Sequence, residues 1–130
     1  RGGVAFVDHS KAFNPRAARA SIASFPSVVL IAGGLAKGLD ITPLARADNV
    51  RHVVAIGESA PSLIEAAGPG RATRAGSMVE AVDLAARMAR SGDTVLLAPG
   101  CASFDMFESY DARGTAFGEA VGSLIGGGAG

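Results

Sequence analysis

Four chemically active side chains follow one another directly after an apolar run near the start of the chain. Residues 8–11 read Asp-His-Ser-Lys and supply a carboxylate, an imidazole, a hydroxyl and an ammonium group. Asn14 and Pro15 come next, and this pair is typical of the first residues of a helix, whose free backbone amides attract anions. We therefore interpret residues 8–15 as one side of a binding site for phosphate or carboxylate groups.

The second lysine of the chain stands in a similar setting. Of the 12 basic residues ten are arginine, and the two lysines, Lys11 and Lys37, both follow apolar runs. Lys37 belongs to the glycine-rich segment 33–38, and Ser103 follows the apolar run 94–98. Together these segments offer two ammonium groups, two serine hydroxyls and several backbone amides, which suit an anionic ligand.

Each of these features also has a simpler structural interpretation. A loop lysine is ordinarily a solvated charge, Ser103 is equally a candidate helix cap, and Gly33-Gly34 is equally a tight turn. Neither GxxxxGK[ST] nor GxGxxG occurs, so a nucleotide-binding phosphate loop would have to come from another domain. No GxSxG motif surrounds Ser103, which leaves a serine hydrolase triad unsupported.

The remaining reactive side chains are assigned to the core or to the surface. Cys101 stands where a strand meets a helix, and it is predicted to be a small buried residue rather than a nucleophile. His52 is predicted to lie on the surface. His9 either contacts a ligand or is a loop residue with no ligand contact. Two arginine pairs have helical spacing and are expected on solvated faces: Arg16 with Arg19, and Arg87 with Arg90.

Short β-rich runs alternate with helical patterns along the chain. Strands are predicted at 4–7, 28–32, 53–56 and 94–98, with a weak edge strand at 72–74. Helices are predicted at 15–25, 61–67, 78–90 and 112–125, and a short one begins at Thr42-Pro43. This alternation indicates an α/β fold, a Rossmann-like three-layer sandwich with a mainly parallel sheet of about five or six strands. Ligands of such sheets bind beyond the carboxyl ends of the strands, here after residues 7, 32, 56 and 98.

The helix at 78–90 has a detailed start signal. Ser77 and Glu80 have the spacing of a capping box, in which each side chain accepts a hydrogen bond from an amide at the helix start. Core-facing intervals are occupied by Val79, by Val82 or Ala86, and by Met88 or Ala89.

Composition excludes several functional classes. The chain has 130 residues and a formal net charge of +0, which fits one folded domain and gives no electrostatic case for nucleic acid or anionic lipid as the main partner. Its longest apolar run, 28–32, is far shorter than the roughly 20 residues of a membrane helix. The 1 cysteine excludes an internal disulfide, and together with 2 histidines it cannot form an ordinary structural zinc site.

The two ends of the chain indicate a piece of a larger protein. The sequence enters a strand-like run almost at once and has no initiator methionine, and residues 126–130 are a glycine-rich segment predicted as a flexible tail. We therefore interpret residues 1–125 as one domain, which is expected to carry only part of a functional site.

Three segments resemble, in the same order, signature segments of the Mur ligases, in the branch that adds D-glutamate during peptidoglycan synthesis. Residues 8–15 are similar to the signature D-S-K-A-T-N, and residues 32–38 are similar to G-G-x-x-K-G. Residues 97–107, then Tyr110 and 113–117, are similar to the ending S-P-A-C-A-S-x-D-x-F…R-G-x-x-F. The three segments span nearly the whole chain, and together they are far more specific than any one alone.

The resemblance implies that residues 1–125 are the C-terminal, amino-acid-binding domain of a three-domain enzyme. In that family the first domain binds the UDP-sugar, and the central domain carries the ATP phosphate loop and the magnesium ligands. ATP and the carboxylate of UDP-N-acetylmuramoyl-L-alanine form an acyl phosphate, which the amine of D-glutamate attacks. The implied partners are these substrates, Mg²⁺ held mainly by the central domain, and the two other domains, in the cytoplasm. The isolated domain is expected to be inactive.

The resemblance also implies roles for single residues. No metal ligand is expected in this chain. The positions implied to bind D-glutamate are Lys37, Ser103, Tyr110 (through nearby backbone) and Phe13. The positions implied to face the nucleotide are Asp8, His9, Ser10, Lys11 and Asn14, with Lys11 near the phosphates as the catalytic residue.

Two positions depart from the pattern of that family. His9 replaces a second acid that contacts the nucleotide, and Phe13 replaces a threonine that helps to hold D-glutamate. A phenyl ring cannot donate that hydrogen bond, so a shifted substrate pose, an altered specificity and a reduced activity all stay open. Two alternatives therefore stand beside the D-glutamate ligase. One is a non-catalytic anion-binding or regulatory module of the same fold, and the other is a related ligase with another amino acid or a folate substrate.

Overall fold

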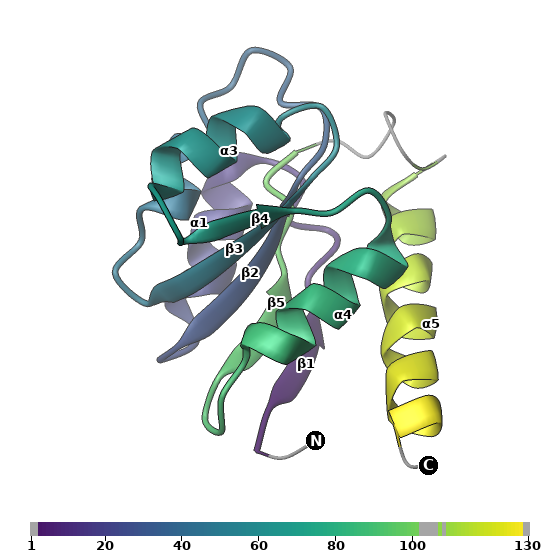
Figure 1. The fold of residues 1–130 in the computed structure, drawn as a ribbon. Coiled ribbons are helices and arrows are strands. Elements are labelled where there is room, and N and C mark those ends of the chain that lie inside the picture. Colours follow the sequence, from purple (N-terminus) through teal and green to yellow (C-terminus); the bar gives the residue numbers. More distant parts are fainter. Residues whose placement is uncertain (1–2, 102–106, 108, 129–130) are drawn as a thin grey trace.

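The computed structural model describes residues 3–101, 107 and 109–128, which form alternating strands and helices (Figure 1). The strands are β1 (Ala5–Asp8), β2 (Val28–Gly33), β3 (Val50–Ile56), β4 (Ala72–Arg74) and β5 (Thr94–Leu97). The helices are α1 (Pro15–Ala23), α2 (Thr42–Ala45), α3 (Ala60–Ala67), α4 (Met78–Met88) and α5 (Tyr110–Gly128). The sequence predicts the last helix to end near Ile125, whereas α5 continues to Gly128.

The described strands form one 5-stranded sheet in the order β1-β5-β2-β3-β4, and every neighbouring pair is parallel. β5, the last strand in the chain, lies between β1 and β2. Its residue Val95 is in register with Phe6 of β1 and with Val29 of β2. This arrangement confirms the predicted α/β class with a parallel sheet.

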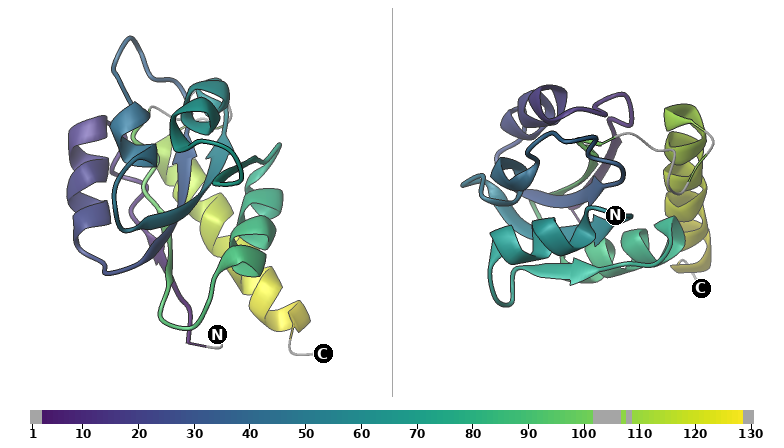
Figure 2. Two further views of the ribbon diagram at one scale, coloured as in Figure 1. Left: turned by 60° about the vertical axis from the view of Figure 1, so that its left-hand side comes forward. Right: turned by 90° about the horizontal axis from the view of Figure 1, so that it is seen from above.

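The two faces of the sheet bury alternate residues of each central strand. In β2, Val28, Leu30 and Ala32 pack in the cluster that contains residues of α1, α2 and α3, while Val29 and Ile31 pack with residues of α4 and α5. All six residues of β2 are buried, because both faces of a parallel sheet are covered by helices. Figure 2 shows these three layers from two sides, with the sheet between the two groups of helices.

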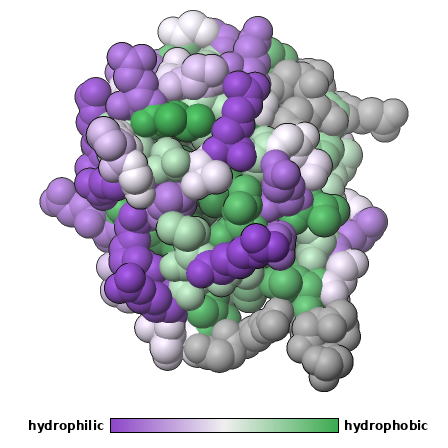
Figure 3. Space-filling view, viewed as in Figure 1, coloured by the Kyte–Doolittle hydropathy of each residue, from purple (hydrophilic) through white to green (hydrophobic). Residues whose placement is uncertain are grey.

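The inward face of α4 differs from the prediction. Met78, Ala81, Val82 and Ala85 are buried, whereas Val79 is 66% exposed and Met88 is 40% exposed. The buried positions follow the i, i+3, i+4, i+7 pattern starting at Met78. The prediction started the core-facing positions at Val79, one residue later in the chain. Figure 3 shows hydrophobic and hydrophilic residues interspersed on this face of the molecule.

The start of α4 agrees with the predicted cap at one of its two bonds. The Ser77 hydroxyl accepts a hydrogen bond from the Glu80 amide at 3.1 Å. The Glu80 carboxylate accepts from the Gly76 amide at 2.7 Å, one residue before the amide that a capping box would use. The first bond satisfies an amide in the first turn that the helix itself leaves without a partner, and the second holds the residue just before the cap.

His52 is a buried residue, and its prediction as a surface residue is wrong. Its exposed fraction is 5%, because β3 begins at Val50 rather than at residue 53 and includes this position. The Nε2 atom of His52 lies 2.9 Å from the Thr73 hydroxyl of β4, which replaces water as its partner. Burial, together with the neighbouring Arg51 charge, lowers the pKa of His52 and favours the neutral imidazole.

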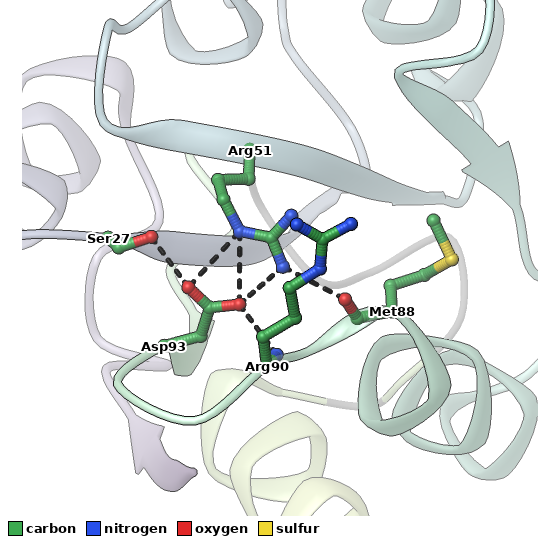
Figure 4. A network of polar contacts seen from close by, with 5 residues as sticks. All are labelled: Ser27, Arg51, Met88, Arg90 and Asp93. Carbon is green, nitrogen blue, oxygen red and sulfur yellow. Dashed lines mark hydrogen bonds and ion pairs between the residues drawn. The ribbon is translucent and has the colours of Figure 1, made fainter. Parts of the chain in front are cut away.

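A carboxylate ties strand starts together at the amino edge of the sheet. Asp93, just before β5, accepts hydrogen bonds from the Ser27 hydroxyl at 2.6 Å and from the Arg90 amide at 2.8 Å, and it pairs with the Arg51 guanidinium (Figure 4). The Arg51 contact, helped by Ser27 and the Arg90 amide, holds the pKa of Asp93 well below its ordinary value of 3.8. This ion pair lies at the edge opposite to the predicted ligand-binding edge.

Candidate functional site

The carboxyl ends of the parallel strands all meet at one edge of the sheet. The chain leaving β1 leads to α1 and the chain leaving β2 leads to α2, both on one face, whereas the chain leaving β5 leads to α5 on the other face. Because β5 lies between β1 and β2, the connections diverge on both of its sides. Divergence of this kind creates the crevice in which open α/β sheets bind ligands.

The loop after β1, residues 9–14 (the β1 loop), is held by backbone and side-chain hydrogen bonds. Asp8 accepts a hydrogen bond from the Ser10 amide at 2.8 Å, and the His9 amide donates to the Leu97 carbonyl of β5 at 2.9 Å. Ser10 is buried, whereas Lys11 is exposed. The loop therefore has a fixed base that presents a solvated ammonium group.

A pocket of about 430 Å³ lies between the β1 loop and α5. It is lined by Asp8, His9, Ser10, Lys11, Asp111, Gly114 and Thr115. The four consecutive residues that the sequence predicts to face the nucleotide thus line the same pocket. One ammonium group and two carboxylates around it suit a ligand that carries both an anionic group and hydrogen-bond donors.

Asn14 and Phe13 have different surroundings at the end of the β1 loop. The Asn14 side chain accepts a hydrogen bond from the Ala17 amide at 2.9 Å and so caps α1, as the sequence predicts. Phe13 is 43% exposed. The oxygen of Asn14 is thus engaged at the helix start, while Phe13 presents a phenyl ring at the edge of the sheet. The imidazole ring of His9, in the same loop, lies beside the phenyl ring of Phe25 in a tilted arrangement, with the ring centroids 6.0 Å apart.

The loop after β2, residues 34–41 (the β2 loop), carries Lys37 in an unusual conformation. Its φ is 53°, the only positive φ among the non-glycine residues that the structure describes, and the next residue, Gly38, has φ 79°. The Leu39 amide donates to the Ala36 carbonyl at 3.0 Å and closes a tight turn around this pair. A lysine held in the left-handed region costs conformational energy, and such strain is concentrated at functional sites.

The base of the β2 loop requires glycine. A Cβ atom on Gly33, whose φ is 130°, would lie 2.0 Å from the Ile56 carbonyl oxygen of β3. The Gly33 amide also donates to the Pro99 carbonyl at 2.9 Å, which ties this loop to the chain leaving β5. The Gly33-Gly34 pair is therefore more than a flexible turn, because it lets two neighbouring strand ends approach closely.

The other predicted residues lie on the chain that follows β5. Cys101 is 1% exposed, which confirms its prediction as a buried residue. Ser103 lies outside the described residues, and Tyr110 is the first residue of α5, with its side chain outside the described part. The β1 and β2 loops flank β5, and about 10 Å separates β1 from β2, the strands that lead into these loops.

Two residues that bind the loops together were missed by the sequence reasoning. Ser59, after β3, exchanges two hydrogen bonds of 3.1 Å with the backbone of Gly34. Arg113 of α5 is 1% exposed and donates to backbone carbonyls of two other segments. The signal available in the sequence was the glycine after Arg113, because a glycine inside a helix often marks a close approach of another segment.

The described residues contain no group of three or more His, Cys, Asp or Glu side chains that could hold a metal ion. Mg²⁺ is commonly held by one or two carboxylates together with substrate phosphates, so this finding does not assign the ion, and no role below is assigned through it. Within this pocket Lys11 suits a phosphate group, since an exposed ammonium group binds phosphate as a point charge, whereas Asp8 and Asp111 suit hydrogen-bond donors. No helix in the described residues is long and apolar enough to cross a membrane.

The fold and this edge define an α/β domain with a parallel sheet, helices on both faces and two lysine-bearing loops beyond the carboxyl ends of its strands. Residues 1–101 match the family model described as "Mur ligase, glutamate ligase domain", and the chain belongs to this family.

Similar curated proteins are named UDP-N-acetylmuramoylalanine--D-glutamate ligase. The protein of Thermobifida fusca is 49% identical over 135 residues, which cover 95% of this chain and 29% of that protein. The protein of Frankia casuarinae is 51% identical over 92% of this chain and 26% of its own length. That of Hahella chejuensis is 47% identical over 95% of this chain and 30% of its own length. The chain thus spans less than a third of the length of these relatives.

Proposed function

We propose that this chain is the C-terminal domain of an ATP-dependent ligase that joins D-glutamate to UDP-N-acetylmuramoyl-L-alanine through an acyl phosphate. The observation that carries the proposal is the position of the two lysine-bearing loops on either side of β5, in a chain of the Mur ligase family. The names of the similar proteins supply the substrates. Such an enzyme would work in the cytoplasm, where nucleotide-linked precursors and ATP are available.

In this proposal the chain binds and orients, while most of the phosphate and magnesium ligands come from other domains. ATP with Mg²⁺ supplies the phosphoryl group that activates the substrate carboxylate. Lys11 faces the phosphates from the pocket beside α5. Asp8, His9, Ser10 and Asn14 belong to the same nucleotide side.

Lys37 holds a carboxylate of D-glutamate from the β2 loop, with Ser103 and the backbone near Tyr110 on the same side. The amine of D-glutamate then attacks the acyl carbon, so a C–N bond forms, the C–O bond to phosphate breaks and the amine loses a proton. Closure of this domain over the reacting groups would exclude water from the acyl phosphate, which water would otherwise hydrolyse.

Replacing Lys37 tests the assigned carboxylate contact in the full-length protein that contains this chain. Lys37→Gln is expected to raise the KM for D-glutamate about 10- to 100-fold, because a charge-assisted hydrogen bond is lost. The KM for ATP should stay near the wild-type value. The matched control is Arg87→Gln, which removes an exposed cation of α4 away from the carboxyl edge. An unchanged KM for D-glutamate in Lys37→Gln would contradict the role.

A related ligase with another amino acid is the second candidate, and the exposed ring of Phe13 favours it. A phenyl ring at this edge supplies apolar contact in place of a hydrogen bond. A panel of D- and L-amino acids, assayed for phosphate release with ATP and the UDP-linked peptide, separates the two candidates. Release that depends on an amino acid other than D-glutamate would favour this second candidate.

A further inference from the structure

The β1 loop, the β2 loop and the end of β5 are joined by buried side chains. Ser59 accepts a hydrogen bond from the Gly34 amide and donates its own amide to the Gly34 carbonyl, both at 3.1 Å. The Ser59 hydroxyl also lies 3.5 Å from the sulfur of Cys101. Since Ser59 is 7% exposed and Cys101 is 1% exposed, this link between the β2 loop and the chain after β5 is shielded from water.

Arg113 continues the link from Cys101 to the β1 loop. Its Nη1 donates to the Cys101 carbonyl at 2.9 Å, and its Nη2 donates to the Ser10 carbonyl at 3.3 Å. The guanidinium is planar and presents its donors in a fixed fork, so it sets the distance and angle between the two carbonyl groups. Arg113 is 1% exposed, so its guanidinium is buried, and these two carbonyl groups engage its Nη1 and Nη2 atoms.

Gly114 lets α5 come close enough for this contact. A Cβ atom at this position would lie 2.4 Å from the Ser10 hydroxyl and 2.8 Å from the Asp8 carboxylate. The helix therefore docks on the β1 loop through its glycine, and the adjacent arginine reaches across to Cys101. Two further glycines of α5, Gly118 and Gly122, face open space. The close approach is thus specific to Gly114 among these three.

We infer that Ser59 and Arg113 are positioning residues that hold the Lys11 and Lys37 loops at a fixed separation by engaging Cys101 from both sides. The inference rests on the proposed function, because it assigns the two loops to the nucleotide and to D-glutamate. Neither residue needs to touch a substrate. Their effect is to keep the cation for the phosphates and the cation for the carboxylate in one rigid arrangement, since a displacement of about 1 Å can cost 10²-fold in rate.

A matched pair of glycine substitutions tests the docking of α5 in the full-length protein. Gly114→Ala and Gly118→Ala make the same change in the same helix, but only the first adds a methyl group against Asp8 and Ser10. We expect Gly114→Ala to lower kcat/KM for both ATP and D-glutamate about 10- to 100-fold. We expect Gly118→Ala to stay within about twofold of the wild type. Equal kinetics for the two variants would overturn the inference.

Arg113→Lys and Ser59→Ala test the coupling itself, with Ser62→Ala, an exposed serine of α3, as the control for the second. A positioning role predicts raised KM values in the fraction that remains folded. A merely structural role predicts a lower kcat in proportion to the folded fraction, at unchanged KM, and that result would overturn the inference.

Hydrogen exchange gives a readout that does not depend on activity. Arg113→Lys should speed exchange of the Gly34 amide, which Ser59 holds and Arg113 does not touch. The Thr94 amide, which donates to the Ser27 carbonyl at the amino edge of the sheet, should exchange at the wild-type rate. If the wild-type protein does not use D-glutamate, the proposed function fails and this exchange result alone decides whether the loops are coupled. Unchanged exchange at Gly34 would overturn the coupling.

Discussion

Single residues show how charge is used differently at the two edges of the sheet. Lys11 and Lys37 stand exposed on loops at the carboxyl edge, where a ligand can reach them. Asp93 is 5% exposed at the amino edge. Its carboxylate pairs with Arg51 and accepts hydrogen bonds from the Ser27 hydroxyl and the Arg90 amide. A net charge of +0 therefore does not describe the two edges, which carry exposed lysines at one side and a buried carboxylate at the other.

The Asp93 contacts predict a specific dependence of stability on pH. Because the folded state holds the pKa of Asp93 below its ordinary value of 3.8, the carboxylate adds stability above that pH and loses it as the pH falls further. Asp93→Asn should lower the free energy of unfolding at neutral pH by about 2 kcal/mol, since hydrogen bonds to a charged group are lost. The variant should also show a flatter acid limb in urea unfolding measured at several pH values. Asp48→Asn, at an exposed position, is the control, and an equal loss in both variants would argue against the assignment.

Helices and strands take their boundaries from local signals and their orientation from the core. Asn14 caps α1 and Ser77 caps α4, as their residue types predict. The inward face of α4, however, begins at Met78 and leaves Val79 in solvent. Several apolar residues in that helix compete for the same inward positions, and packing against β2 and β3 decides among them.

The cap of α4 gives a prediction at this scale. Ser77→Ala removes the hydroxyl that accepts from the Glu80 amide, so the free energy of unfolding should fall by about 1 kcal/mol. Thermal or urea unfolding of the chain measures the effect. Ser62→Ala, within α3 and exposed, is expected to change stability by less than about 0.5 kcal/mol. A loss at Ser62 as large as that at Ser77 would contradict the capping role.

The molecule as a whole combines a self-contained core with a site that is incomplete under the proposed function. Both faces of the sheet are covered by helices, and the two hydrophobic clusters are formed by residues of this chain. The site, in contrast, offers the described residues Lys11 and Lys37 but no phosphate loop motif anywhere in the chain. We therefore expect these residues to be enough for folding, whereas catalysis under the proposed function also needs groups from other domains.

This difference predicts the behaviour of the 130-residue chain on its own. It should unfold in a single cooperative transition, because one parallel sheet organises both clusters. It should release no phosphate in the presence of ATP, D-glutamate and the UDP-linked peptide, since the phosphate-loop groups are absent. Circular dichroism and a phosphate-release assay measure the two properties. Turnover by the isolated chain would show that the site is complete within these residues.

The sequence by itself determined the elements, the parallel α/β class and the placement of both lysines beyond strand ends. These features depend on apolar runs, caps and glycines that act over a few neighbouring residues, as in the wholly buried run of β2. Only the tertiary structure decided that β5 lies between β1 and β2, that His52 is buried, and that Ser59 and Arg113 meet at Cys101. The physical reason is that these contacts join residues far apart in the chain, such as Arg113 and Ser10, and no local pattern specifies their partners.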